Sequence, residues 1–380
     1  GSDPIGRELV RREAPDPAYY IGSGKAKELR GVTKALDIDV VVFDNGLSPA
    51  QQRNLQEVFE CDVVDREALI LDIFAQHATS REGALQVELA LLRYRLPRLR
   101  GMGKQLSQQG AGIGTRGPGE TKLETDRRRI ESKIAKLVRE LKALSSTRTT
   151  QRKARRRAAM PQVALIGYTN AGKSTLLNRV TEAQVLAEDR LFSTLDSTIR
   201  RADLPDGQTV LLSDTVGFVR RLPHHLVEAF RSTLDDVKES DLLLHLVDAS
   251  DPDPEGQIAA VHEVVAEVGA DEVPELIVFN KIDLADPIDI GRLRRLYPDA
   301  PMISALTGEG VDDLLAYLGE RLHAATVLMR LSIPYERGDV LAAAHRLGDV
   351  LVEKHEDTAT VIEARIQVID QSRFAEFLTA

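Results

Sequence analysis

The sequence predicts an α/β chain built of four parts, and three observations support that prediction. Short apolar runs alternate with helical patterns near the N-terminus, and the same alternation returns after residue 160, as in sheets covered by helices. Between these regions, leucines recur at steps of three and four over a long basic stretch. The expected parts are a small α/β domain at residues 1–80, a helical hairpin at 81–158, a larger α/β domain at 159–326 and a small C-terminal α/β domain at 327–380.

The composition is typical of a globular protein. Of the 380 residues, 43% are hydrophobic and 29% are charged, and no apolar run reaches the length of about 18 residues that a membrane span needs. The one cysteine, Cys61, can form no internal disulfide, which fits a reducing compartment. We therefore expect a cytoplasmic protein that is monomeric when free. Because the chain opens on Gly1 rather than methionine, we also expect a native N-terminal segment to be missing.

The N-terminal part is expected to be the first α/β unit. Apolar runs at residues 39–44 and 61–65 predict two buried strands. Helical patterns cover residues 48–59 and continue from residue 66 to 77. Residues 22–25 resemble a phosphate loop only in part, because a tyrosine stands where such a loop needs its first glycine. We therefore interpret this stretch as the start of an ordinary helix.

Two seams of apolar residues predict the antiparallel helical hairpin. One seam covers residues 85–99 and the other covers 130–144, and both have the spacing of helices that pack along their length. Thr121 and Glu124 have the spacing of a capping box, which begins a helix. The second arm, residues 122–157, would reach roughly 50 Å as a continuous helix.

A glycine-rich segment at residues 110–119 joins the two arms. Residues 112–117 have the form G-x-G-x-x-G, the fingerprint of a dinucleotide site. That fingerprint requires a strand before it, whereas a leucine-rich helix is expected here. We therefore interpret the segment as a hairpin tip with few side chains and not as a nucleotide site.

Positive charge is concentrated in the hairpin. The whole chain has a net charge of −9, yet residues 81–160 contain 21 Lys and Arg against 7 Asp and Glu. Such segregation indicates a polyanionic partner. Residues 147–157, which lead into the next domain, could contact phosphates and so provide salt-dependent affinity for nucleic acid. A solvated basic helix is the alternative interpretation.

A nucleotide site is predicted just after residue 160. Residues 161–166 form a nearly unbroken apolar run, typical of a buried parallel strand. Residues 167–175 follow with the P-loop form G-x-x-x-x-G-K-S-T before a helix. The backbone N–H groups of such a loop surround the β-phosphate at the positive end of the helix dipole. Lys173 is expected to contact the β- and γ-phosphates, and Ser174 to ligate Mg²⁺.

Three later motifs favour GTP over ATP. Residues 214–217 have the form D-x-x-G, in which Asp214 can hold Mg²⁺ through water and the Gly217 N–H can sense the γ-phosphate. Residues 280–283 have the form N-K-x-D, and the Asp283 carboxylate can accept hydrogen bonds from guanine N1–H and N2–H₂ together. Residues 304–306 then offer a backbone N–H to guanine O6.

A switch loop is expected between the P-loop and Asp214. It needs a threonine that completes the Mg²⁺ shell only while the γ-phosphate is present. Thr194 is the first candidate and Thr198 the second. Many signalling GTPases place a glutamine after D-x-x-G to orient the attacking water, whereas this chain has Phe218. Since phenylalanine forms no such hydrogen bond, we expect slow hydrolysis by the protein alone and faster hydrolysis with a partner.

The predicted site is a set of short segments. The catalytic residues are Lys173, Thr194, Asp214 and Gly217. The Mg²⁺ ligands are Ser174 and Thr194. The residues expected to bind GTP or GDP are Gly167, Tyr168, Thr169, Asn170, Ala171, Gly172, Lys173, Ser174, Thr175, Phe192, Ser193, Thr194, Leu195, Asp196, Asp214, Thr215, Val216, Gly217, Asn280, Lys281, Ile282, Asp283, Ser304, Ala305 and Leu306.

Several of these segments resemble the Obg–HflX branch of translation-associated GTPases. The likeness lies in GYTNAGKST at 167–175, LFSTLD at 191–196, DTVGF at 214–218, NKID at 280–283 and ISAL at 303–306. Upstream, LSPAQQRNL at 47–55, LILDIFAQHA at 69–78, LQVELALLRYRLPRL at 85–99 and GTRGPGETKLETDRRRI at 114–130 are similar to HflX in particular. The likeness covers roughly residues 20–325.

The resemblance implies a P-loop GTPase domain in a factor that binds the large ribosomal subunit. HflX-type proteins are similar in placing the hairpin tip near the peptidyl-transferase centre and in separating stalled ribosomes into subunits. The residues that would then contact 23S rRNA are Gly112, Gly114, Arg116, Gly117, Gly119, Lys122, Arg127, Arg128 and Arg129. Two alternatives stay open: a GTPase that acts in ribosome or RNA assembly, and an RNA-binding scaffold whose nucleotide site is structural.

Overall fold

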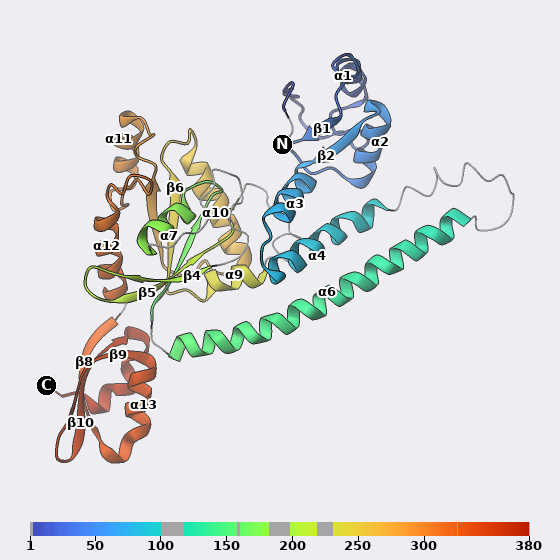
Figure 1. The fold of residues 1–380 in the computed structure, drawn as a ribbon. Helices are drawn as coiled ribbons and strands as arrows, with labels where there is room; N and C mark the ends of the chain where they lie inside the picture. The colour runs from blue at the N-terminus through green and yellow to red at the C-terminus, as the bar shows by residue number, and fades with distance from the viewer. Residues whose placement is uncertain are drawn as a thin grey trace. The chain divides into compact units, whose positions relative to one another are not determined.

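The computed structural model describes residues 3–99, 118–157, 160–181, 198–218, 231–324 and 326–379 and is drawn in Figure 1. It divides into two compact units, one made of Gly1–Gln76 with Ala84–Glu140 and the other of His77–Gly83 with Leu141–Ala380. The α/β class predicted from the sequence is confirmed, with parallel strands and covering helices in both units. The four-domain division with boundaries near residues 80, 158 and 326 stays a prediction.

The N-terminal region is a small α/β unit. Strands β1 (Val40–Phe43) and β2 (Asp62–Asp65) pair in parallel, and the helices are α1 (Ser23–Ala35), α2 (Pro49–Phe59) and α3 (Arg66–His77). The prediction that the first of these strands is buried is wrong, because Val40 and Val42 are exposed. Helix α1 begins directly after Gly22, so residues 22–25 form the start of an ordinary helix, as predicted. The buried core consists of Ile21, Ala26, Phe43, Leu47, Leu55, Phe59 and Val63.

A buried carboxylate fastens helix α4 (Arg81–Arg98) to this small sheet. Asp65, at the end of β2, is fully buried. It accepts hydrogen bonds from the Leu47 N–H at 3.1 Å, from the Tyr94 hydroxyl at 2.9 Å and from Arg98 Nη2 at 3.0 Å. Because the charge is fully satisfied by donors, the burial of Asp65 has a structural explanation.

The predicted second arm is a single helix, α6 (Pro118–Arg157), of 40 residues. It begins three residues before Thr121, so the predicted helix start at the capping box is wrong; Pro118 occupies the first turn, where a missing N–H costs nothing. In the predicted seam, Leu137 is buried and its apolar neighbours along the same stripe are partly buried. An ion pair joins Lys133 of α6 to Glu88 of α4. The predicted tip at residues 110–117 lies outside the described residues.

The third region is a five-stranded sheet in the order β4-β5-β3-β6-β7, antiparallel only at β4 among the strands that the structure describes. The strands are β3 (Gln162–Gly167), β4 (Ile199–Asp203), β5 (Thr209–Asp214), β6 (Leu242–Asp248) and β7 (Glu275–Asn280). The helices are α7 (Lys173–Thr181), α9 (Arg231–Lys238), α10 (Pro254–Val268), α11 (Pro287–Leu296) and α12 (Val311–Ala324). Since parallel strands align their carboxyl ends, the ends of β3, β5, β6 and β7 meet at one edge, where α/β sheets bind ligands.

The C-terminal region is a separate three-stranded antiparallel sheet in the order β8-β10-β9. Its elements are β8 (Thr326–Pro334), η1 (Tyr335–Arg337), α13 (Gly338–Leu347), β9 (Gly348–His355), β10 (Ala359–Gln367) and η2 (Val368–Phe377). Its buried core consists of Met329, Leu331, Ile333, Val340, Ala344, Ile362, Ala364, Ile366 and Phe374. Among the described helices of the whole chain, none combines the length and the apolar character needed to cross a bilayer.

Candidate nucleotide site

The loop between β3 and α7 has a backbone that only glycine fits at two positions. Gly167 has a φ of +148°, and a Cβ there would lie 2.2 Å from the Leu246 carbonyl oxygen. Gly172 has a φ of +93°, and a Cβ there would lie 2.2 Å from Asn280 Nδ2. The two glycines therefore bring the loop against β6 and β7, and they leave backbone N–H groups at the N-terminus of α7, the arrangement that binds phosphate.

Lys173, the first residue of α7, is folded back into this loop. Its Nζ donates hydrogen bonds to the carbonyl oxygens of Gly167 and Tyr168 at 3.1 and 3.0 Å, and its side chain is 6% exposed. Burial lowers the pKa of Lys173 to about 8, although the nearby Asp214 charge opposes that shift. A desolvated ammonium group in this position is ready to exchange two carbonyl oxygens for phosphate oxygens.

Two oxygen donors lie beside the loop. The Ser174 hydroxyl donates a hydrogen bond of 2.7 Å to Asp214 Oδ2, and Asp214 is fully buried at the end of β5. Hydroxyl and carboxylate oxygens are the ligands that Mg²⁺ prefers. The two predicted residues that share the role of holding the metal are therefore in direct contact.

The D-x-x-G segment runs back onto the P-loop. The Phe218 N–H donates to the Gly167 carbonyl at 3.1 Å, and the Thr169 N–H donates to the Phe218 carbonyl at 2.8 Å. A Cβ on Gly217 would lie 2.9 Å from Thr169 Cγ2 and 3.3 Å from Lys173 Nζ, so a side chain at residue 217 would press against Thr169 and the lysine ammonium. The Phe218 side chain is 2% exposed, which makes it a core residue.

Asn280 connects the P-loop with the segment predicted to read guanine. Its Nδ2 donates to the Ala171 carbonyl at 2.7 Å, and its Oδ1 accepts from the Ala305 N–H at 2.8 Å. The Ala305 N–H, one of the predicted donors to guanine O6, is thus bonded to Asn280 in this structure. Lys281 has a φ of +63° and forms an ion pair of 2.7 Å with Asp248, and Asp283 is exposed.

Arg179 belongs to the same site and was not among the predicted residues. It lies in the last turn of α7. Its Nε donates to the Ala305 carbonyl at 2.6 Å and its Nη2 to the Leu306 carbonyl. A Cβ on Gly308 would lie 2.7 Å from Arg179 Nη1. Arg179 therefore positions the loop of residues 304–306, and the only sequence signal was a cation on the helix that follows the P-loop.

The comparisons with known proteins agree with this geometry. Family models match residues 1–75 (GTP-binding GTPase N-terminal), 77–155 (GTP-binding GTPase Middle Region) and 162–281 (50S ribosome-binding GTPase). The GTPase HflX of Caldanaerobacter subterraneus subsp. tengcongensis is 44% identical over 378 residues, which cover 100% of this chain and 87% of that protein. The GTPase HflX of Escherichia coli is 45% identical over 368 residues, which cover 96% of this chain and 86% of that protein. This chain belongs to the HflX family of GTPases.

Membership of the HflX family gives the site its chemistry: the chain binds guanine nucleotides and hydrolyses GTP. A solved structure of a GTP-binding protein from Sulfolobus solfataricus in complex with GDP is 24% identical, with a TM-score of 0.42, and covers 81% of this chain and 88% of that one. At that level of likeness, the solved structure adds nothing to what the HflX relationship already shows.

The structure brings together part of the predicted HflX site. The P-loop, the D-x-x-G segment, Asn280 and Ala305 form one bonded cluster. Thr198 is described, and its carbonyl oxygen accepts a hydrogen bond of 2.9 Å from the Asp214 N–H. The predicted switch residues that lie outside the described residues are Phe192, Ser193, Thr194, Leu195 and Asp196.

The predicted RNA contacts are described only in part. Gly119 and Lys122 lie in the first turns of α6. Arg128 and Arg129 are strongly exposed and pair within the helix, with Glu124 at 3.3 Å and with Asp126 at 3.7 Å, while Arg127 pairs with Glu131 at 2.8 Å. Exposed pairs of this kind are weak, so these arginines can turn toward a phosphate backbone. The predicted tip residues outside the described part are Gly112, Gly114, Arg116 and Gly117.

Proposed function

We propose that this HflX-family GTPase docks on the large ribosomal subunit in its GTP-bound state and separates stalled ribosomes into subunits. The observation that carries the proposal is the combination, in one chain, of the nucleotide site with a 40-residue helix whose sequence is rich in arginine and lysine. The family model over residues 162–281 describes a 50S ribosome-binding GTPase, which supports the same partner. Hydrolysis of GTP would then release the factor.

The contacts around Lys173 suggest how the γ-phosphate is sensed. In this structure, Lys173 Nζ donates to the carbonyl oxygens of Gly167 and Tyr168, and a Cβ added at Gly217 would lie 3.3 Å from that ammonium group. A γ-phosphate needs both the ammonium and the Gly217 N–H as partners. Its arrival would draw Lys173 away from the carbonyl oxygens and move Gly217, so the D-x-x-G segment would adopt a second position in the GTP state.

The residues beside the P-loop fit Mg²⁺. The Ser174 hydroxyl and the buried Asp214 carboxylate lie 2.7 Å apart, and both are hard oxygen donors. Bound there, Mg²⁺ would neutralise charge on the β- and γ-phosphates. We propose Ser174 and Thr194 as direct ligands, with Asp214 accepting from a coordinated water. Thr194 would also order the switch loop.

We propose that the guanine base is read by Asp283 and by the loop of residues 304–306. Asn280 and Arg179 would act as positioning residues, because Asn280 bonds both the P-loop and Ala305 and Arg179 bonds the carbonyl oxygens of Ala305 and Leu306. An exposed Asp283 carboxylate would lose water on binding and regain two hydrogen bonds from guanine, which adenine does not provide.

Co-sedimentation with purified 50S, 30S and 70S ribosomal particles tests the ribosomal role. With a non-hydrolysable GTP analogue, the protein should pellet with 50S and convert 70S to subunits, and with GDP it should stay in the supernatant. A variant without residues 110–119 should bind GTP normally but should neither split 70S nor show ribosome-stimulated hydrolysis. If splitting and stimulation both persist in that variant, the proposed role of the tip is wrong. Pelleting with 30S alone would favour an assembly factor instead.

A further inference from the structure

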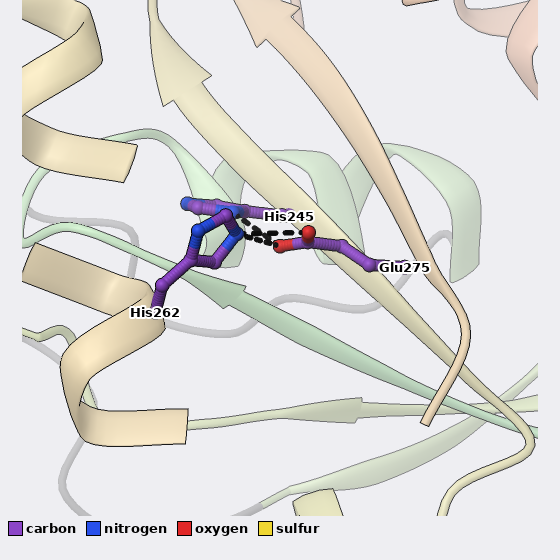
Figure 2. Close-up of side chains that lie close together, drawn as sticks. All are labelled: His245, His262 and Glu275. Carbon is purple, nitrogen blue, oxygen red and sulfur yellow. Dashed lines mark hydrogen bonds and ion pairs between the residues drawn. The ribbon is translucent and has the colours of Figure 1, made fainter. Parts of the chain in front are cut away.

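Three side chains of the kinds that bind metal ions gather on one face of the GTPase sheet, away from the candidate nucleotide site. His245 comes from the middle of β6, Glu275 from the start of β7 and His262 from helix α10. Figure 2 shows the two imidazole rings turned toward the Glu275 carboxylate. One ligand atom from each residue lies within 4.8 Å of the other two. Among the described residues, this is the one His, Cys, Asp and Glu cluster with such spacing.

The alternation of the strands explains why these residues meet. Leu242, Leu244 and Leu246 of β6 belong to the core on one face of the sheet. His245 therefore projects from the opposite face, where Val247 packs with Ile258 of α10. In β7, Glu275 lies four residues before Phe279, so the two residues share a face of the sheet. Phe279 packs in the same cluster as Val247 and Ile258. The fold thus places a histidine and a carboxylate on adjacent strands beneath a helix that carries a second histidine.

The distances place the donor atoms close together. His245 Nδ1 lies 2.7 Å from Glu275 Oε1. His262 Nε2 lies 3.0 Å from Glu275 Oε1 and 2.9 Å from Glu275 Oε2. In a tetrahedral Zn²⁺ site with metal–ligand bonds of about 2.0–2.1 Å, neighbouring donors are roughly 3.3 Å apart. A Zn²⁺ site would need each histidine–carboxylate contact to open by a few tenths of an ångström and the two imidazole nitrogens, now within 4.8 Å of each other, to take up the same spacing. The half-exposed His262 has the freedom to move in this way.

We propose that His245, His262 and Glu275 bind one Zn²⁺ ion. Two imidazole nitrogens and one carboxylate oxygen are a common protein ligand set for zinc. The fourth position would hold water, since Glu275 and His262 are both open to solvent in part. The ion would join α10 to β6 and β7, so it would fasten the helix that covers this face of the sheet.

This site is separate from the site for the nucleotide and Mg²⁺. His245 lies three residues before Asp248, the last residue of β6, which is about 10 Å along the strand. Glu275 begins β7 whereas Asn280 ends it, about 17 Å farther along. The donors also differ, since Mg²⁺ prefers oxygen donors and phosphates over imidazole. The proposal therefore does not depend on the proposed ribosomal function.

Calorimetric titration of the full, tag-free and chelator-treated chain with Zn²⁺ tests the proposal, and Co²⁺ provides a spectroscopic probe. We expect one Zn²⁺ per chain and the visible absorption of a four-coordinate Co²⁺ complex. The variant His262→Gln, which changes a half-exposed residue, should bind Zn²⁺ at least about 100-fold more weakly, because loss of a direct ligand exceeds the roughly 10- to 100-fold effect of outer residues. Glu275→Gln should have the same effect.

The matched control is His345→Gln. His345 Nε2 lies 3.0 Å from Glu353 Oε2 in the C-terminal region, so it forms an exposed His–Glu pair of the same kind. This variant should keep the full Zn²⁺ affinity and the Co²⁺ spectrum. The proposal is overturned if the unsubstituted chain binds no Zn²⁺, if His262→Gln leaves the affinity unchanged, or if His345→Gln abolishes binding. Circular dichroism of each variant separates loss of the ligand from loss of the fold.

Discussion

Strands β6 and β7 carry two polar clusters, and the clusters are built in opposite ways. At their carboxyl ends, Asp248 and Asn280 belong to the nucleotide site, where the side chain of Asn280 packs against a P-loop backbone that only glycine fits at residue 172. Farther back, His245 and Glu275 meet a histidine from a separate helix through side chains alone. The first cluster depends on backbone that admits one residue type, whereas the second depends on rotamers that can adjust. Substitutions at the nucleotide site should therefore have large effects, whereas substitutions at the His245 cluster should have small ones.

The largest effect is expected from Gly172→Ala. A Cβ there would lie 2.2 Å from Asn280 Nδ2, and the φ of +93° is strained for alanine. Clash and strain of about 3 kcal/mol should weaken GDP and GTP binding by roughly 100-fold, measured with fluorescent nucleotides. Gly291→Ala, where a Cβ meets nothing within 4 Å, should bind normally. Equal nucleotide affinities for the two variants would show that the nucleotide site does not depend on a glycine backbone at residue 172.

Arg179→Ala should have the next largest effect. It removes two charge-assisted hydrogen bonds to the loop of residues 304–306, each of which contributes about 1.5 kcal/mol or more. Because Asn280 still accepts from the Ala305 N–H, only part of this free energy should reach the nucleotide. We expect affinity for guanine nucleotides to fall about 10-fold and dissociation to quicken, as measured by stopped-flow release of labelled GDP. Arg292→Ala, which removes an ion pair with Glu255 outside the site, is the control. Unchanged release from Arg179→Ala would show that the loop holds its position without it.

Nucleotide affinity should also depend on pH through Lys173. Burial gives this lysine a pKa of about 8 in the nucleotide-free protein, and contact with phosphates would raise that pKa because they favour the charged form. Below pH 8 the lysine is already protonated, so nucleotide binding causes it to take up no proton from solvent. Above pH 8 binding takes up a proton, and the affinity should fall about 10-fold per pH unit. Calorimetry in two buffers of different ionisation enthalpy measures the uptake, and its absence at about pH 9 would refute the prediction.

The smallest effect is expected at the other cluster. Without metal, His262→Gln removes a half-exposed contact with Glu275, and such surface pairs contribute about 1 kcal/mol or less. Urea unfolding of the metal-free protein at neutral pH should therefore show a small change in the free energy of unfolding. A loss of about 3 kcal/mol or more would mean that the cluster is a structural network, and the contrast between the two ends of the strands would disappear.

The same contrast explains what the sequence could and could not predict. The P-loop, D-x-x-G and N-K-x-D segments were found because each keeps its chemistry within a few consecutive residues, and Asn280 and Asp214 lie where strand ends predicted them. Arg179 and the His245 cluster were missed, because their partners lie 126 and 30 residues away in sequence. The second arm was predicted to begin at residue 122, four residues late, because the Thr121–Glu124 pair has the spacing of a capping box.

The backbone pairing between Phe218 and the P-loop has a mechanical consequence. Two hydrogen bonds join Phe218 to Gly167 and Thr169, so the segment proposed to sense the γ-phosphate is bonded directly to the loop proposed to bind the β-phosphate. While both bonds persist, Phe218 moves together with Gly167 and Thr169, so the shift that we propose for Gly217 is confined to the residues that precede Phe218. A displacement of the P-loop on nucleotide binding would thus reach Phe218 through backbone hydrogen bonds.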